Sequence, residues 1–388
     1  MKKLIFIFFL VITRLVTNAQ WTITSGPSEP NVTSLAANDS IVIAGCSSAS
    51  SNLGGHRTLN QGNNWSPTGG NLLSKFTSLA INSVNGVIYA GGGNTFYQSS
   101  DNGSTFTNTN NGLSPYTTYD IIIDGSNLYA STQGVYFSNN SGLNWSLISP
   151  VIASYKMDKS NDTIIVATIN SGIYLSTDNG VSWINIVLGL PSNIADVKIV
   201  GNNYLAATVS GILISTNNGA SWTTTNLTLN TQCIYQVGTT LFAGCSGGGV
   251  YYSTNGGTTW IAENTGLTNL TVYSLSSNST YLFAGTTGYV FRRPLIDFGI
   301  ISSISNQNDN EKEIRIIPNP SFGNFIINQA KAKKLEIEIH NSFGNVIYKT
   351  VSEDSNIKID LGNTSKGIYF IRIIDSSKDI IERKIILN

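Results

Sequence analysis

The eight residues Ser176-Thr-Asp178-Asn-Gly180-Val-Ser-Trp183 decide the fold, because the same pattern occurs five more times in the chain. The pattern is Ser or Thr, any residue, Asp or Asn, any residue, Gly, two further residues and an aromatic residue. Its aromatic residues are Trp65, Phe106, Trp145, Trp183, Trp222 and Trp260, so consecutive copies are 41, 39, 38, 39 and 38 residues apart. A fixed period of this length indicates a repeat architecture.

Each period also contains a strand that ends in Ala and a small residue, at Ala44, Ala90, Ala130, Ala167, Ala207, Ala243 and Ala284. A Gly and a short apolar strand follow, so one period contains four short strands, as in a propeller blade. The seventh period stops before its box, but Trp21 matches the aromatic residue that follows each box. We therefore predict an all-β fold in which residues 20–297 form a seven-bladed β-propeller. The N-terminal strand closes it and pairs the edges that an open ring would expose.

The repeated pattern resembles the Asp-box (BNR) motif of sialidases and of many propellers that are not sialidases. Its Asp or Asn can accept backbone amides within its own turn, and its Gly supplies a positive φ. Four of the six boxes carry Asn at the third position. Asn can cap the turn as Asp does, but it could not replace a carboxylate that takes part in catalysis. We therefore predict a structural role for the third box residues, which are Asn60, Asp101, Asn140, Asp178, Asn217 and Asn255.

The chain begins with Met1-Lys2-Lys3 and a short apolar run, followed by Thr17-Asn18-Ala19. This order predicts a signal peptide over residues 1–19 rather than a membrane anchor, because the run is too short to span a bilayer. No later stretch is apolar enough to do so, and we expect no membrane span in the mature chain. Residues 21–297 hold 7 Lys and Arg against 11 Asp and Glu, which does not favour nucleic acid as a partner.

The last part of the chain differs in composition, since residues 298–388 hold 12 Lys and Arg and 11 Asp and Glu. We predict a linker over residues 298–313 and a small β-sandwich over residues 314–388, where Leu335–Ile339 alternates apolar and acidic residues. Ile317–Pro320, Asn341–Ile347, Ile359–Leu361, Lys366–Arg372 and Glu382–Leu387 resemble the type A sorting domain of the Bacteroidetes type IX secretion system. The resemblance implies passage through the periplasm and export across the outer membrane. The secretion machinery would be the partner of residues 314–388, and the product would be secreted or attached to the cell surface.

Sialidases of this repeat family use three arginines from different blades. The predicted propeller offers Arg57, Arg292 and Arg293, and the last two are adjacent, so on a strand they point to opposite faces. No arginine triad can be assembled, which argues against a sialidase. A glycoside hydrolase needs only two facing carboxylates, and it stays open as the alternative function. The candidates are Asp120, Asp124, Asp158, Asp162, Asp196 and Glu263.

The sequence favours a binding or scaffold protein over an enzyme, and we assign no catalytic, cofactor or metal-binding residues. His56, the sole histidine of the propeller region, replaces the Tyr of sister blades and reads as a packed strand residue. The loops that join one blade to the next share a face, which we call the loop face. A rim of aromatic residues there would suit a polysaccharide or a surface protein: Phe76, Tyr116, Tyr119, Tyr155 and Tyr273.

Three cysteines, Cys46, Cys233 and Cys245, lie in the predicted propeller. A hairpin turn centred on Thr239 would place Cys233 opposite Cys245, and an exported protein meets an oxidising compartment. Two alternatives stay open for this pair: a disulfide between them, or two small buried thiols.

Overall fold

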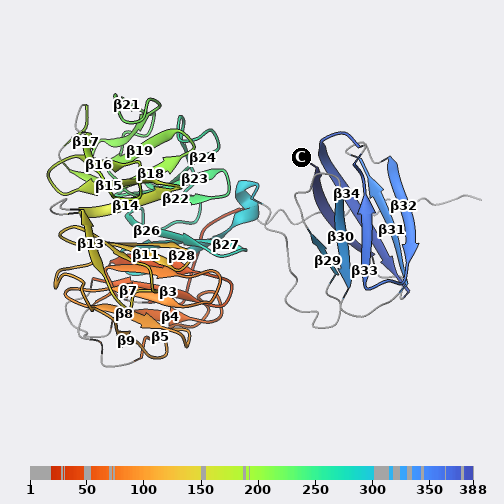
Figure 1. The fold of residues 1–388 in the computed structure, drawn as a ribbon, viewed down its shortest axis with the longest axis horizontal. Helices are drawn as coiled ribbons and strands as arrows, with labels where there is room; N and C mark the ends of the chain where they lie inside the picture. Colours follow the sequence, from red (N-terminus) through yellow and green to blue (C-terminus); the bar gives the residue numbers. More distant parts are fainter. Residues whose placement is uncertain are drawn as a thin grey trace, which may run out of the picture. The chain divides into compact units, whose positions relative to one another are not determined.

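A computed structural model describes residues 19–27, 29, 31–47, 54–69, 72, 75–149, 154–186, 189–191, 193–300, 314–317, 324–329, 334–341, 345–362, 364–376 and 380–387. The predicted signal peptide up to residue 18 and most of the predicted linker lie outside these ranges, as do residues 318–320 and 342–344 of the sorting-domain resemblance. The chain divides into two compact units, residues 1–303 and 304–388. Figure 1 colours the first unit from red to teal and the second in blue.

The described part of the first unit contains seven four-stranded antiparallel sheets, which we number as blades in chain order. Blade 1 consists of β2 (Val32–Ala37), β3 (Val42–Cys46), β4 (His56–Thr58) and β5 (Ser66–Pro67). Blade 2 consists of β6 (Ser78–Ile81), β7 (Ile88–Gly91), β8 (Phe96–Ser99) and β9 (Thr107–Asn108). Blade 3 consists of β10 (Asp120–Asp124), β11 (Asn127–Ser131), β12 (Val135–Ser138) and β13 (Ser146–Ser149). Blade 4 consists of β14 (Ser154–Ser160), β15 (Thr163–Thr168), β16 (Ile173–Ser176) and β17 (Ile184–Ile186).

The remaining blades follow the same order of strands, with one exception at the closure. Blade 5 consists of β18 (Ile194–Val200), β19 (Asn203–Thr208), β20 (Gly211–Ser215) and β21 (Thr223–Thr224). Blade 6 consists of β22 (Thr231–Val237), β23 (Thr240–Cys245), β24 (Gly249–Ser253) and β25 (Ile261–Ala262). Blade 7 consists of β26 (Val272–Ser277), β27 (Tyr281–Thr286), β28 (Val290–Pro294) and the N-terminal strand β1 (Thr22–Ile23).

The first strands of the seven blades form a closed ring, because each contacts the next and β26 contacts β2. In Figure 1 the teal strands of blade 7 accordingly lie beside the orange strands of blade 1. The predicted closure is confirmed, since β1 pairs antiparallel with β28 with Thr22 opposite Arg292. Trp21 also bonds like Trp145: its indole donates to the carbonyl of Glu263 in the preceding blade, as that of Trp145 does to Thr109.

All six boxes form the same hydrogen-bonded turn between the third and fourth strands of a blade. The hydroxyl of the first box residue donates to the side-chain oxygen of the third, and it accepts the amide of the Gly. The oxygen of the third residue accepts the amide four positions later. The residue before the Gly also has a positive φ, for example 55° at Asn102 and 57° at Asn218. This conformation, tolerated best by Asn and Gly, explains the Asn or Gly found there in four boxes.

The packed propeller extends slightly beyond its predicted end at residue 297. The short helix η1 (Leu295–Phe298) follows β28, and the ring of Phe298 packs against Phe242 and Tyr252 of blade 6, with ring centroids 4.8 Å and 5.5 Å apart. Ile300 contacts the same cluster. The first residues of the predicted linker therefore belong to the propeller.

The second unit is a β-sandwich of a three-stranded and a four-stranded antiparallel sheet. The first sheet contains β29 (Ile314–Ile317), β30 (Asn324–Gln329) and β33 (Asn356–Asp360). The second contains β32 (Val346–Ser352), β31 (Leu335–His340), β34 (Gly367–Asp375) and β35 (Ile380–Leu387). Alternate residues of β31 are buried, and Ile337 shares one core with Phe325 and Ile359 of the other sheet. The two-residue period thus turns the apolar face of each sheet towards the other.

Candidate functional site

Of the residues predicted to form the aromatic rim of the loop face, Phe76 is buried, and its prediction as a rim residue is wrong. Phe76 is fully buried, with its ring 5.0 Å from that of Phe106 and 6.2 Å from that of Tyr97. Its ring occupies space that Gly54 and Gly55 leave open, because a Cβ on either glycine would lie about 3 Å from the ring. Phe76 therefore packs within the propeller and cannot line a rim.

The other four tyrosines stay at least partly accessible. Tyr116 is 47% exposed, and Tyr119, Tyr155 and Tyr273 are half-buried. Tyr119 and Tyr155 come from blades 3 and 4 and form a tilted pair with ring centroids 5.2 Å apart. The structure thus brings two of the predicted rim residues together at the loop-face end of neighbouring inner strands.

One position on the inner strands recurs in every blade, and we call its members the ring residues. On the first strand of each blade, one residue pairs with an Ala or Val of the second strand, as Leu35 pairs with Ala44. The ring residue is the one immediately before it, which in blade 1 is Ser34. The ring residues are Ser34, Ser78, Asp120, Lys156, Asp196, Cys233 and Ser274. In five of the blades a register shift lies at or just before them, which changes the direction of the side chain.

The three serines of the ring link neighbouring blades through neutral hydrogen bonds. Ser34 donates to the carbonyl of Phe76 at 3.0 Å, Ser78 to that of Thr118 at 3.0 Å, and Ser274 to that of Val32 at 2.9 Å. Each bond crosses to the following blade, with blade 7 bonding to blade 1.

The charged ring residues also bridge blades, but with carboxylates and an ammonium group. Asp120 accepts the amide of Met157 at 3.0 Å, and Lys156 donates to the carbonyl of Tyr119 at 2.9 Å. The Lys156 Nζ also lies 3.6 Å from a carboxylate oxygen of Asp120. Asp196 accepts the amides of Val197 at 2.9 Å and of Ile234, in blade 6, at 2.7 Å.

Burial dominates the electrostatics of this group. It raises the pKa of Asp196 to about 7, although Lys156 and the two amides act in the opposite direction. Burial by itself lowers the pKa of Lys156, but Asp120 and Asp196 outweigh it and the net direction is upward. Lys156 therefore stays charged, while Asp196 titrates near neutral pH.

The carboxylates considered for a glycoside hydrolase are all engaged by other groups. Asp120 and Asp196 act as inter-blade acceptors at the ring position. The others are bonded too: Asp124 to Lys159, Asp158 to Lys198 and the amide of Ile199, Asp162 to Asn179, and Glu263 to Arg293. These partners give each carboxylate a role in joining strands or blades.

The two adjacent arginines of blade 7 point in opposite directions, as their strand position predicts. Arg292 donates to the carbonyl of Gln61, whereas Arg293 is buried and pairs with Glu263 at 2.7 Å and Asp297 at 3.3 Å. They therefore do not converge on one ligand.

The three thiols and the imidazole of His56 are buried or half-buried in the propeller. All three cysteines carry free thiols, and burial raises the pKa of Cys46 to about 12 and of Cys245 to about 11. The predicted register of Cys233 is wrong: the turn pairs Val237 with Thr240, so Cys233 faces Gly244 and no disulfide is formed. His56 is half-buried on β4, and burial lowers its pKa.

Sequence reasoning missed two exposed leucines of the loop face, Leu229 and Leu270, which are 41% and 40% exposed. They flank the loop Gly247-Gly248-Gly249 of blade 6. A Cβ on Gly248 would lie 2.6 Å from Leu229, and the amide of Gly249 donates to the carbonyl of Leu270. The signal in the sequence was a leucine between two polar residues in each loop, as Thr228-Leu229-Asn230 and Asn269-Leu270-Thr271.

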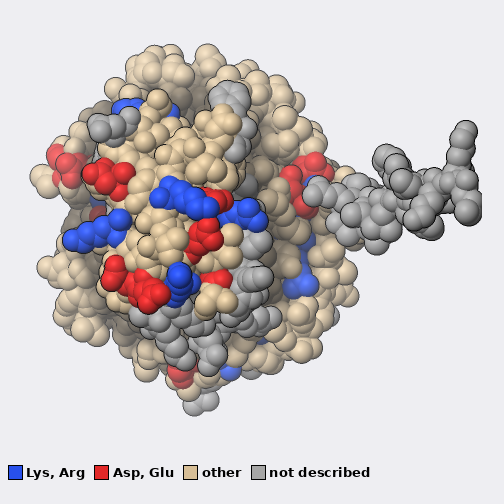
Figure 2. Space-filling model, turned by 90° about the vertical axis from the view of Figure 1, so that its right-hand side faces the viewer, with Lys and Arg blue, Asp and Glu red and all other residues tan. Residues whose placement is uncertain are grey.

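Neither a candidate metal site nor a candidate membrane-spanning helix occurs in the described ranges. No group of three or more His, Cys, Asp and Glu side chains there could hold a metal ion. No helix of the described residues is long and apolar enough to cross a membrane. Most of the surface visible in Figure 2 is neither acidic nor basic, and the charges that do appear are of both signs.

The molecule thus combines a closed β-propeller with a separate β-sandwich at its C-terminal end. Residues 315–388 match the secretion system C-terminal sorting domain. The sandwich is therefore a type IX secretion sorting domain, and the protein is exported to the cell surface or secreted. No curated protein matches the chain at a significant level.

Solved structures similar to this chain are propeller proteins. The type IX secretion surface component PorZ of Porphyromonas gingivalis is 13% identical with a TM-score of 0.55, and the match covers 94% of this chain and 60% of PorZ. The chain therefore spans about three fifths of the length of PorZ. YCF48 of Cyanidioschyzon merolae is 14% identical with a TM-score of 0.56, covering 72% of this chain and 100% of YCF48. At identities this low, the structural similarity shows a shared fold and nothing more.

Proposed function

We propose that this protein is a binding or scaffold protein of the outer cell surface or the medium, and that its propeller recognises another surface protein through the loop face. The observation that carries the proposal is the pair of exposed leucines, Leu229 and Leu270, on either side of the triple-glycine loop. Two apolar side chains held around a loop without side chains present a shallow contact surface, which suits an apolar anchor of a protein partner. A similar propeller, YCF48, has been solved with a D1 peptide bound.

The route to that location follows from the sequence predictions. The signal peptide over residues 1–19 would take the chain into the periplasm, and the secretion machinery would then recognise residues 314–388. Deletion of residues 314–388 should leave the propeller in the periplasm, measured by cell fractionation and immunoblotting. Normal surface export of the truncated chain would contradict this route.

The binding proposal is tested with the full mature chain as bait in a pull-down of biotinylated surface proteins. A Leu229→Asp, Leu270→Asp variant should lose the partner, because the buried anchor surface would carry two charges. The matched control, Leu143→Asp with Val181→Asp, places the same charges at exposed positions of the box turns on the opposite face. Equal capture by both variants would sink the proposal.

A polysaccharide is the second candidate ligand, and the Tyr119–Tyr155 pair favours it. Two tyrosine rings at the mouth of the propeller can stack on a sugar ring. A glycan array with the mature chain and with a Tyr119→Ala, Tyr155→Ala variant separates the two ligand classes. Binding that the tyrosine variant loses and the leucine variant keeps would assign a sugar. A glycoside hydrolase gains no support, because its candidate carboxylates are occupied by strand and blade contacts.

A further inference from the structure

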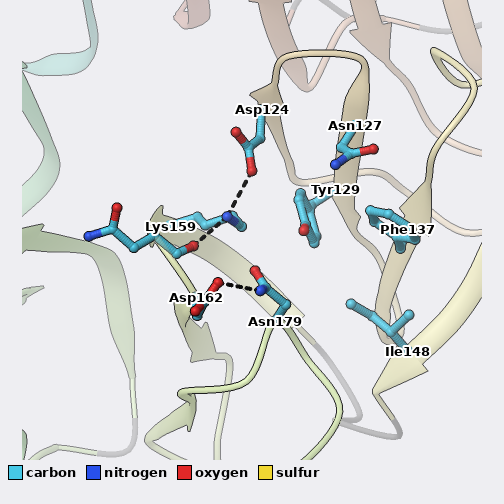
Figure 3. A pocket seen from close by; sticks show the side chains of 9 residues that line it. Asp124, Asn127, Tyr129, Phe137, Ile148, Lys159, Asp162 and Asn179 are labelled. Atoms are coloured by element: carbon cyan, nitrogen blue, oxygen red, sulfur yellow. Dashed lines mark hydrogen bonds and ion pairs between the residues drawn. The ribbon is translucent and has the colours of Figure 1, made fainter.

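A pocket of about 670 Å³ lies between blades 3 and 4, on the side of the box turns. Figure 3 shows Tyr129 and Phe137 on one side of it, with Asp124 above and Asp162 and Asn179 below. Asp124 ends β10, the strand that begins near Tyr119, so the pocket lies at the opposite end of the inner strands from the loop face. It is therefore independent of the function proposed above.

One wall of the pocket is aromatic, and the net charge of the pocket is negative. The rings of Tyr129 and Phe137 are tilted with centroids 5.1 Å apart. The Lys159 Nζ is 2.8 Å from a carboxylate oxygen of Asp124, so these two charges compensate each other. Asp162 accepts the side-chain amide of Asn179, and no ion pair within the described ranges neutralises it. The pocket therefore carries a net charge of about −1 near neutral pH.

Phe137 occupies a position that holds a donor at three other blade interfaces. Phe137 pairs with Tyr129, which comes immediately before Ala130 of the second strand. The residues at the equivalent position of blades 1, 2 and 7 are Arg57, Gln98 and Arg292. Each of these three donates to the carbonyl of the residue before the box Gly of the next blade. The acceptors are the carbonyls of Asn102, Ser141 and Gln61.

The equivalent carbonyl in the pocket is that of Asn179, and Phe137 has no group that can donate to it. Among the described residues no side-chain donor reaches this oxygen, and the Asn179 side chain turns to Asp162 instead. At the next two interfaces the equivalents of Phe137 are Leu175 and Ile214, which are buried and fill the space. At the interface of blades 3 and 4 Phe137 stays partly exposed, and the space is open.

The sister interfaces show which group fits there. At two of the three the donor is an arginine, and Arg292 also stacks over the ring of Tyr281 with its guanidinium carbon 5.0 Å from the ring centroid. A guanidinium is planar, always charged, and can donate to a carbonyl and a carboxylate at once while it stacks on a ring. The pocket offers these three partners: the Asn179 carbonyl, Asp162 and the ring of Phe137, whereas the Tyr129 ring already has the Lys159 Nζ 5.6 Å from its centroid.

We propose that the pocket between blades 3 and 4 binds an arginine side chain presented by a peptide segment of a partner protein. The guanidinium donates to the carbonyl of Asn179 and to Asp162, and it stacks on Phe137. Lys in place of Arg binds more weakly, because an ammonium group lacks the planar fork. The partner's arginine thus supplies from outside the contact that Arg57 and Arg292 make from within the chain.

The test is a titration of the mature full-length chain with Ac-Gly-Arg-Gly-NH2, followed by amide chemical shifts. The citrulline peptide, which keeps the shape and loses the charge, and the lysine peptide should each bind at least about tenfold more weakly. Asp162→Asn should weaken the arginine peptide by about tenfold. The control Asp101→Asn makes the same charge change in the box of blade 2 and should leave binding unchanged.

A second variant fills the pocket from within. Phe137→Arg recreates the contact of Arg57 and should abolish peptide binding, with a melting temperature equal to or above that of the wild type. Failure of the arginine peptide to bind, or equal binding of the citrulline peptide, would overturn the proposal. So would undiminished binding by both Asp162→Asn and a folded Phe137→Arg. Free arginine that binds as tightly as the peptide would overturn the assignment to a protein segment.

Discussion

The two halves of the propeller solve one structural problem with different chemistry. In blades 7, 1 and 2 the ring residues are Ser274, Ser34 and Ser78, and each donates one neutral hydrogen bond to the following blade. In blades 3 to 5 the same position holds Asp120, Lys156 and Asp196, which bridge blades with charged groups. The repeat therefore supplies the place and direction of the side chain. The residue placed there decides whether the joint responds to pH.

The largest expected effect comes from removing the buried carboxylate of the charged half. Asp196→Ala leaves the amides of Val197 and Ile234 without their acceptor, and it should lower the free energy of unfolding by about 3 kcal/mol. Ser34→Ala removes one hydroxyl donor and should cost about 1 kcal/mol. Urea unfolding of the mature chain, followed by tryptophan fluorescence, measures both values, and similar losses would erase the difference between the halves.

The charged half should also make stability depend on pH near neutrality. Because burial raises the pKa of Asp196 from 3.8 to about 7, the folded chain holds a proton that the unfolded chain releases. Its contribution to stability is complete below the unfolded pKa and is lost as the pH rises through the folded one. Between pH 5 and pH 7 the wild type should therefore lose about 2 kcal/mol relative to Asp196→Asn. A constant difference between the two proteins across this range would contradict the prediction.

The smallest expected effect concerns a feature that both halves share, the box turn. Asn60→Ala in blade 1 and Asn217→Ala in blade 5 each remove an acceptor for one exposed backbone amide, and each should cost about 1 kcal/mol or less. Asn217→Asp should be nearly neutral, since two boxes already carry Asp. Thermal unfolding measures the three variants. A much larger loss in blade 5 than in blade 1 would show that the halves differ beyond the ring position.

The periodic features of the fold could be predicted from the sequence, because they repeat with a fixed spacing. The box turns, the ring of blades and the closure by Trp21 all follow from one pattern and its missing seventh copy. The ring residues could not be found in this way. The strand pairing shows why. In blades 4 and 5 the residues equivalent to Ala44 are Val166 and Ala206, each one residue before the Ala that the sequence pattern aligns with it, Ala167 or Ala207.

The binding surfaces were harder to predict, because exposure depends on neighbours far away in the chain. Phe76 is an aromatic residue in a loop between two blades, as expected of a rim residue, yet Gly54 and Gly55 of blade 1 leave the space in which its ring is buried. The pocket at Phe137 results from an absent donor, which is visible only when Phe137 is compared in register with the equivalent residues of the other blades. A single-sequence pattern records which residues are present, and it does not show which space they leave unfilled.

The pairing of β1 with β28 has a consequence for how the molecule gains and loses its structure. The partners Thr22 and Arg292 are 270 residues apart, so the last blade lacks its outer strand until almost the whole propeller has been synthesised. Closing so long a loop is slow. In the closed ring, however, each blade contacts a neighbour on both sides and cannot separate on its own. We expect the exported propeller to unfold as one cooperative unit and to resist proteases for as long as its two ends stay paired.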